Sequence, residues 1–250
     1  MKRTTAEQEV SLVFHALCLT TSVLAVRRSW NTKFAWFTFQ RYGGQWKYMS
    51  HWLLYANALY TAYALFVDIY NIVTGYTCRP MQKDDRPLLV RIRDEIFNTI
   101  CFPFGVGHTL IFAALTKANT GFFVSLINRR KEDLTAYYMM YLHVFPLVFC
   151  FLETAMTYHK SNRSRLQSMK ISVITSVAFV AWILCVAYFG GYWSYPFLRR
   201  ANVAVRILCF VLYPLITAGC YVIGEKVTEK LWMSVSDVGH VEVQEKNKDD

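Results

Sequence analysis

The chain contains few charged residues for its length. Of its 250 residues, 18% are charged, whereas about a quarter of the residues in a soluble domain are charged. Hydrophobic residues make up 54% of the chain. They gather in runs of about 20 residues, enough for a helix to cross a hydrocarbon core of roughly 30 Å. The shortage of charge therefore excludes an ordinary soluble domain and indicates an integral membrane protein.

Familiar motifs of hydrolases, metalloproteases and nucleotide-binding proteins are also absent. The sequence has no GxSxG, HExxH or Walker motif, and its seven cysteines include no CxxC pair. No spacing suggests a zinc site, and most of the cysteines lie inside apolar runs, where they act as small packing residues. We therefore expect neither a metal nor a cofactor, and any enzyme here must be of a less common kind.

The positive charge of the chain has a membrane explanation. A formal net charge of +10 would suggest nucleic-acid binding in a soluble protein. Here Lys and Arg lie between the apolar runs, where they contact anionic headgroups and set the topology. We expect membrane lipids as partners and no nucleic acid, and the sequence leaves the oligomeric state open.

The apolar runs predict an all-α fold, a multipass transmembrane helical bundle of about six spans. The first run ends in Arg27-Arg28 without a cleavage site, so we interpret it as a span and not as a signal peptide. Residues 1–232 are expected to form one transmembrane domain, followed by a polar, disordered tail at 233–250. The six candidate spans are residues 10–26, 48–75, 95–117, 134–158, 169–193 and 203–224.

Orientation follows from the basic residues between spans. Lys and Arg are slightly more frequent on the side that carries both termini, which predicts that both termini are cytoplasmic. The sequon Asn162-Arg163-Ser164 would then face the cytoplasm and stay unglycosylated. We expect the cell membrane in preference to the endoplasmic reticulum.

Polar residues inside spans are costly, so they are the first candidates for chemistry. Ser50 lies at the start of the second span, His108 in the third and His143 in the fourth. Each also has a structural interpretation, because serine is a common N-cap and a span histidine often bonds a neighbouring helix. Both interpretations are open at this point.

Geometry favours the pair Ser50 and His143. The second and fourth spans run in the same direction, and the expected depths of the two residues differ by about 10 Å or less. A serine beside a histidine is the minimum for nucleophilic acyl transfer, because the histidine takes the hydroxyl proton. Glu153 is ten residues after His143, about 15 Å along the helix, and cannot orient that imidazole.

The acidic residues of the spans are expected to have a structural role and not a catalytic one. They all approach the side that carries the termini, where basic residues also lie. We predict that they form an interfacial polar network that fixes helix packing. Its expected members are Asp68, Arg93, Asp94, Glu153 and Glu225.

Five segments resemble a known family, the androgen-induced protein and androgen-dependent TFPI-regulating protein family. Together they cover residues 42 to 226, and their order and spacing are more specific than any one of them. They are YGGQWKYMS at 42–50 with Asp68 after it, Arg93-Asp94 followed by Phe102-Pro103, His143 with Glu153, YWSYP at 192–196, and Gly224-Glu225 after Tyr221.

The resemblance implies a multipass membrane enzyme that hydrolyses fatty acid esters of hydroxy fatty acids. Ser50 would take the place of the family's threonine nucleophile, and His143 that of its catalytic histidine. Serine offers the same hydroxyl as threonine. The family's Asn-His pair before the histidine is replaced by Met139-Met140, and the following proline, Pro146, comes two residues earlier than in the family.

Two function classes follow. In the first, the chain is a lipid esterase in which His143 activates Ser50. Backbone N–H groups at the start of the second span, or Lys47, stabilise the oxyanion, and Arg206 holds the free carboxylate of a lipid ester substrate. In the alternative, it is a non-catalytic lipid-binding or signalling membrane protein of the same fold, which the missing Asn-His pair motivates.

Overall fold

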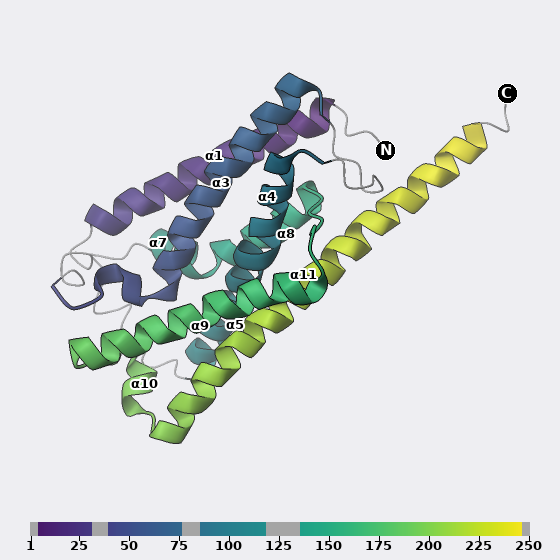
Figure 1. Ribbon diagram of the computed structural model, residues 1–250. Coiled ribbons are helices and arrows are strands. Elements are labelled where there is room, and N and C mark those ends of the chain that lie inside the picture. The colour runs from purple at the N-terminus through teal and green to yellow at the C-terminus, as the bar shows by residue number, and fades with distance from the viewer. Residues whose placement is uncertain (1–4, 32–39, 77–85, 119–135, 247–250) are drawn as a thin grey trace.

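The structure is a computed structural model that describes residues 5–31, 40–76, 86–118 and 136–246 (Figure 1). These residues form helices and no strands, which confirms the all-α fold. In chain order the elements are α1 (Thr5–Asn31), η1 (Gly44–Lys47), α3 (Met49–Thr74), α4 (Leu88–Ile96), η2 (Phe97–Cys101), α5 (Phe102–Ala118), α7 (Ala136–His143), α8 (Phe145–Met156), α9 (Arg165–Gly190), α10 (Pro196–Arg200) and α11 (Val203–Lys246).

Four helical stretches are long and apolar enough to cross a membrane. They are Gln8–Trp30, Leu88–Ala118, Arg165–Gly190 and Val203–Trp232, and they correspond to the first, third, fifth and sixth predicted spans. Helix α3 occupies the second predicted span, but its tyrosines, asparagines and Asp68 lower its mean hydropathy, and it is not among the four. The fourth predicted span is divided between α7 and α8. The membrane bundle is thus confirmed, with four spans supported by length and composition.

Proline accounts for one break between helices and for one local change of helix type. Pro146 has no backbone N–H and cannot continue the hydrogen bonding of α7, so α7 ends at His143 and α8 begins at Phe145 with this proline in its first turn. Pro103 follows η2, a π-helical turn that accommodates the missing donor between α4 and α5. The break before Pro146 places His143 at the end of a helix.

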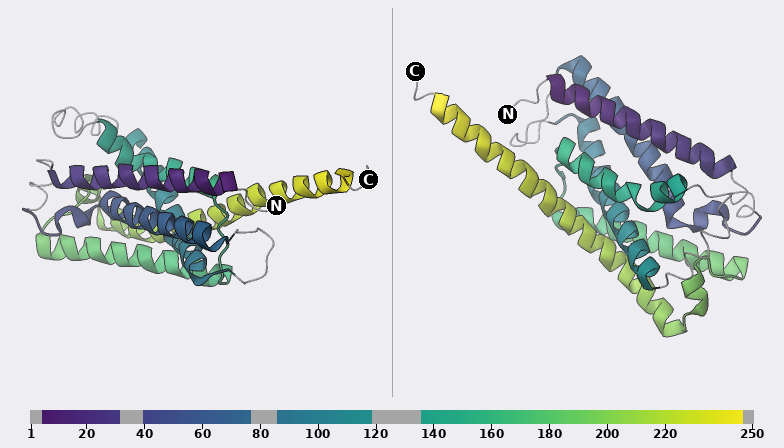
Figure 2. Two further views of the ribbon diagram at one scale, coloured as in Figure 1. Left: turned by 90° about the horizontal axis from the view of Figure 1, so that it is seen from above. Right: turned by 180° about the vertical axis from the view of Figure 1, so that it is seen from behind.

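The helices form a bundle with two distinct ends (Figures 1 and 2). Helix α1 packs along α3, and α11 packs against α9 and α5. Both termini lie toward one end, which we call the terminal end. The opposite end, which we call the η1 end, contains η1, the start of α3, the end of α9 and α10.

Helix α11 continues beyond the bundle toward the C-terminus (Figure 2). It ends at Lys246, past the boundary at residue 232 that the sequence suggests, and residues 247–250 lie outside the described chain. The division into a membrane domain and a disordered tail stays a prediction.

A buried histidine joins three helices toward the terminal end. The Nδ1 of His15 in α1 lies 2.7 Å from Asp68 of α3, and its Nε2 lies 2.8 Å from Glu153 of α8. Only an imidazolium has two N–H donors, so this arrangement fits a protonated His15 between two carboxylates. Ser11 and Tyr60 each donate a further hydrogen bond to these carboxylates. All five side chains are buried.

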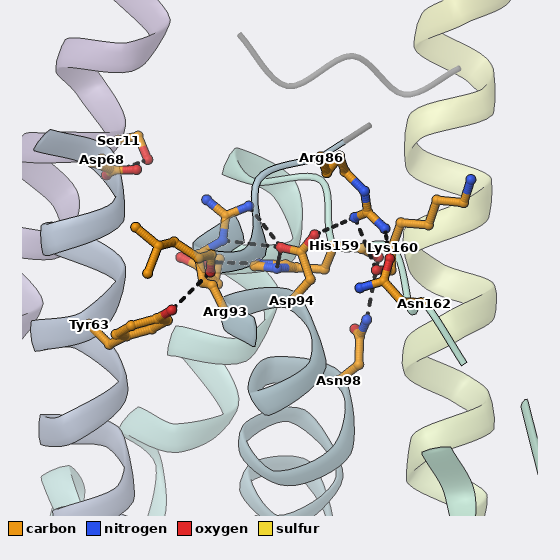
Figure 3. Close-up of polar contacts among 12 residues, drawn as sticks. Ser11, Tyr63, Asp68, Arg86, Arg93, Asp94, Asn98, His159, Lys160 and Asn162 are labelled. Atoms are coloured by element: carbon orange, nitrogen blue, oxygen red, sulfur yellow. Dashed lines mark hydrogen bonds and ion pairs between the residues drawn. The ribbon is translucent and has the colours of Figure 1, made fainter. Parts of the chain in front are cut away.

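The network continues from Glu153 to Asp94 through a second histidine. His159 bonds Glu153 through Nε2 (2.9 Å) and Asp94 through Nδ1 (3.1 Å). Arg93 and Arg86 both donate to Asp94, which lies at the centre of this part of the network (Figure 3). Three buried carboxylates therefore meet two imidazoles and two guanidiniums, which offsets the cost of placing charge in a low-dielectric interior.

The network contains four of the five residues that the sequence suggests for it. Asp68, Arg93, Asp94 and Glu153 belong to it. Glu225 of α11 does not, because it pairs with Arg165 at the start of α9 in a separate, partly exposed ion pair. Nothing in the sequence pattern pointed to His15 and His159, which link the carboxylates.

We expect Glu153→Gln to destabilise the fold by about 3 to 5 kcal/mol, because it leaves His15 and His159 without their shared buried carboxylate. Glu225→Gln is the matched control, and removal of its partly exposed pair should cost less than about 1 kcal/mol. The measurement is unfolding by sodium dodecyl sulfate in mixed micelles. Equal sensitivity of the two variants would show that the buried network does not hold the bundle.

Candidate functional site

The η1 end begins with a tight glycine turn. Gly43 and Gly44 have φ values of 81° and 51°, which other residues rarely adopt. A Cβ at Gly43 would lie 2.9 Å from Cγ2 of Val186 in α9. Glycine thus lets this turn pack directly on α9 and lead through η1 into α3.

Ser50 is buried in the first turn of α3. It is not the N-cap, because Tyr48 holds that position without a side-chain capping bond, so the N-cap interpretation of Ser50 is wrong. Its side chain is 7% exposed, and no hydrogen bond joins it to another described residue. The hydroxyl is therefore available for chemistry.

His143 is held by two side chains of α5. Its Nδ1 lies 3.0 Å from Nε2 of His108, and its ring stacks on Phe112 with centroids 3.8 Å apart and planes within 6°. His108 and Phe112 are one helical turn apart, so both face the same neighbour. The contact with His108 uses Nδ1 of His143 and leaves Nε2 for another partner.

Ser50 and His143 lie on helices that pack together. The hydroxyl of Tyr138 in α7 is 3.3 Å from Nε2 of His51, the residue after Ser50. His51 and His108 both lie close enough to His143 for a positive charge on either ring to disfavour protonation of His143. No hydrogen bond joins Ser50 to His143 in the described structure, so their catalytic pairing stays a prediction.

Lys47 lies three residues before Ser50 and is buried. Its Nζ donates to the hydroxyl of Tyr192 (2.9 Å) and lies over the rings of Tyr48 and Tyr192. Burial, together with the positive charge of Arg41, lowers the pKa of Lys47 from its ordinary 10.5 to about 8. An ammonium in this position is poorly compensated.

Arg206 of α11 lies at the same end but is bound by the protein itself. Its Nε donates to the carbonyl oxygen of Leu198 (2.8 Å), and its guanidinium lies 4.5 Å from the ring centroid of Trp193. The role in substrate binding suggested for Arg206 stays a prediction.

Residues 192–195 complete this end. Tyr195 accepts a hydrogen bond from the backbone N–H of Met49 (3.0 Å), one of the groups that the first turn of α3 leaves without a helical partner. Two tyrosines of one segment thus contact Lys47 and Met49, although about 145 residues separate them. The sequence marked both segments, 42–50 and 192–196, but not their contact, and it left the role of His108 open.

The described residues contain no cluster of His, Cys, Asp or Glu that could hold a metal ion. The described side chains at the η1 end offer a hydroxyl, imidazoles and an ammonium.

Comparison with known proteins identifies the family. A sequence model of the FAR-17a/AIG1-like protein family matches residues 10–229, which is most of the chain. The chain belongs to this family. The match includes all five segments on which the resemblance rests.

Curated relatives of this FAR-17a/AIG1-like protein carry consistent names. The androgen-induced gene 1 protein of Homo sapiens is 23% identical over 195 residues, covering 77% of this chain and 80% of the relative. The androgen-dependent TFPI-regulating protein of Mesocricetus auratus is 24% identical over 192 residues, with coverage of 76% and 78%. The human protein of the same name is 23% identical over 190 residues, with coverage of 76% and 78%. No solved structure matches the chain.

We expect His108→Ala to destabilise the fold by about 1 to 3 kcal/mol, because it leaves the buried Nδ1 of His143 unpaired. The matched control is Thr109→Val on the same turn of α5, whose hydroxyl bonds only the carbonyl of Gly105 in its own helix. Thermal unfolding in detergent measures both. If His108→Ala unfolds at the same temperature as Thr109→Val, the contact between the two histidines does not fix the imidazole of His143.

Proposed function

We propose that this chain is a membrane lipid esterase that hydrolyses fatty acid esters of hydroxy fatty acids with Ser50 as nucleophile and His143 as general base. The observation that carries the proposal is the fixed imidazole of His143, held by His108 and Phe112, on a helix that packs against the start of α3. Family membership supports the same class of reaction through the resemblance of its motifs.

The proposed reaction starts with proton transfer from Ser50. Nε2 of His143 takes the hydroxyl proton while the oxygen attacks the ester carbonyl. The tetrahedral intermediate collapses to the acyl-enzyme as the imidazolium returns this proton to the leaving alcohol oxygen. His143, neutral again, deprotonates the water that attacks the acyl-enzyme, and then returns the proton to Ser50 as the fatty acid leaves. A bond between a nucleophile and its base often forms only when substrate is bound, so the proposal requires that Ser50 and His143 approach each other in that state.

His108 supplies the orientation that a carboxylate gives in other hydrolases. If Nε2 of His108 accepts a hydrogen bond from Nδ1–H of His143, the tautomer that leaves Nε2 free as a base is favoured. A neutral partner adds no net charge to a pocket within the membrane, where an unpaired carboxylate would be costly.

The site lies at one end of a bundle whose outer surfaces are apolar. Leu59 and Tyr188 are among the most exposed side chains on the sides of the bundle, and such surfaces face lipid in a membrane protein. A lipid ester can therefore approach laterally from the bilayer.

A fluorophosphonate probe should label the wild-type chain and not Ser50→Ala, because the probe reacts only with an activated hydroxyl. The matched control is Ser176→Ala, which removes a buried hydroxyl that lies between α9 and α11 and bonds Thr217. Labelling is read by in-gel fluorescence of the purified protein in detergent. Labelling that persists in Ser50→Ala would end the assignment of Ser50.

Ser50→Thr should keep hydrolysis within about tenfold of the wild-type rate, since threonine offers the same hydroxyl. The assay is release of fatty acid from a panel of lipid esters, with Ser50→Ala as the inactive reference. An inert threonine variant beside an active wild type would contradict the alignment of Ser50 with the family's nucleophile.

A non-catalytic lipid-binding protein of the same fold is the second candidate. The observation that favours it is that Met139 and Met140 replace the family's Asn-His pair, and Met140 is 59% exposed. Absence of hydrolysis by the wild type across the ester panel would support this class. Hydrolysis that falls by about a hundredfold or more in His143→Ala would exclude it.

A further inference from the structure

We propose that Lys47 binds the carboxylate of a long-chain acyl lipid, next to Ser50. Binding of a carboxylate at Lys47 does not depend on whether the chain is an enzyme. The further claim that the bound lipid acid is the substrate rests on the proposed function.

The first argument is the incomplete coordination of the Lys47 ammonium. Its side chain is 2% exposed, and an ammonium has three N–H donors. The phenol of Tyr192 takes one of them. No described carboxylate lies within ion-pair distance of Lys47. A buried ammonium without a counter-ion is costly. An anion bound beside the rings of Tyr48 and Tyr192 would neutralise the charge and accept the remaining N–H donors.

The second argument is the charge of the η1 end. The described residues of this end include no Asp or Glu, in contrast to the paired charges of the terminal end. The excess of positive charge among the described residues of this end raises the local concentration of anions. These described basic residues are Arg27, Arg28, Arg41, Lys47, Lys117, Arg199, Arg200 and Arg206.

The third argument is a set of buried polar atoms without hydrogen-bond partners. Both amide atoms of Gln45, in η1 with Lys47, are buried and unpaired, and so is the hydroxyl of Ser194, between the two tyrosines that contact the start of α3. Gln45 is 1% exposed. Native structures rarely leave such atoms unpaired. Unpaired buried hydroxyls also occur at the terminal end, at Thr157 and Tyr221, so Gln45 and Ser194 support a ligand here through their position beside the uncompensated ammonium of Lys47.

The location specifies an acyl lipid. Trp46 and Trp193 at this end are typical of the level of the headgroups, where the polar group of an amphiphile lies. A single ammonium matches the single charge of a carboxylate, whereas a phosphate would call for further buried donors. Tyr192, which accepts a hydrogen bond from Lys47, is only partly buried.

Lys47 is better suited to this role than Arg206. The Nε of Arg206 is already used by the carbonyl of Leu198, and its guanidinium is stacked on Trp193. Lys47 retains two unused donors. An ammonium that binds the substrate's acid group cannot also stabilise the oxyanion, so backbone N–H groups at the start of α3 would have that task.

The experiment is photo-crosslinking of a diazirine-bearing palmitic acid to the full chain in neutral lipid nanodiscs. We expect unlabelled palmitate to compete with the probe for labelling. Hexadecanol and hexadecyl phosphate should need concentrations at least about tenfold higher for the same competition. Lys47→Met, which keeps the packing of the stem, should lower labelling by about tenfold or more, and Lys47→Arg should restore most of it. Lys117→Met at the same end should label as wild type.

Binding should also weaken as pH rises through about 8, where Lys47 loses its proton. The described charged and titratable groups around Lys47 are Arg41, Tyr48 and Tyr192. Arginine stays charged at this pH and tyrosines stay neutral, with the pKa of Tyr192 raised further by burial. Lys47→Arg should therefore bind independently of pH between 7 and 9.

The possible outcomes test the carboxylate site at Lys47 separately from the proposed esterase activity. Labelling of Lys47→Met at the wild-type level, or equal competition by hexadecanol, overturns the carboxylate site. Preferential competition by hexadecyl phosphate shows a phosphate site instead and also overturns it. Should Lys47→Met fail to fold, the competition profile and pH dependence of the wild type test the site alone. Binding of palmitate without hydrolysis of any ester would keep this site and remove the esterase, whereas hydrolysis with an unchanged KM in Lys47→Met would do the reverse.

Discussion

The bundle depends on the pairing of carboxylates in an interior that water does not reach. Asp68, Glu153 and Asp94 come from three different helices, and each would be strongly unfavourable alone. His15 and His159 link them into one chain of hydrogen bonds, which requires α1, α3, α4 and α8 to pack in a single arrangement. Helix packing in lipid lacks the hydrophobic effect that drives it in water, so directional polar contacts have a larger share in fixing the fold.

This constraint sets the register of the helices that carry the candidate site. His51 precedes Asp68 by 17 residues within α3, so helical rise places them about 26 Å apart along that helix. The contact between Tyr138 and His51 joins α7 to the η1 end of α3. His143 lies five residues after Tyr138, about 8 Å further along α7. Side chains lean toward the N-terminus of their helix, which directs the imidazole of His143 back toward the η1 end.

Sequence reasoning reached the elements more readily than their contacts. Run length predicts the helices, because it depends on local composition. It does not predict the break before Pro146, because residues 134–158 form a single apolar run and membrane helices tolerate proline. The missed residues depend on distant partners: His15 looks like any polar residue in an apolar run until Glu153, 138 positions later, is placed beside it. The resemblance of motifs marked Ser50 and His143, whereas the support of His143 by His108 follows only from the packing of α5 on α7. The sequence places Glu225 at the same depth as the network residues, but it does not show which way its side chain faces around the helix. In the structure Glu225 faces Arg165 and not the network.

The two ends of the bundle treat charge in opposite ways, and this contrast suggests a division of labour. At the terminal end every buried carboxylate has cationic partners, so the charges there contribute rigidity and leave little capacity for a ligand. At the η1 end the buried ammonium of Lys47 has no carboxylate partner among the described residues, although single unpaired polar atoms occur at both ends of the bundle. A protein tolerates such a cation where function requires it and where the rest of the fold is stable enough to hold it. The paired network therefore supports an end that holds an uncompensated cation, and anion binding is expected there.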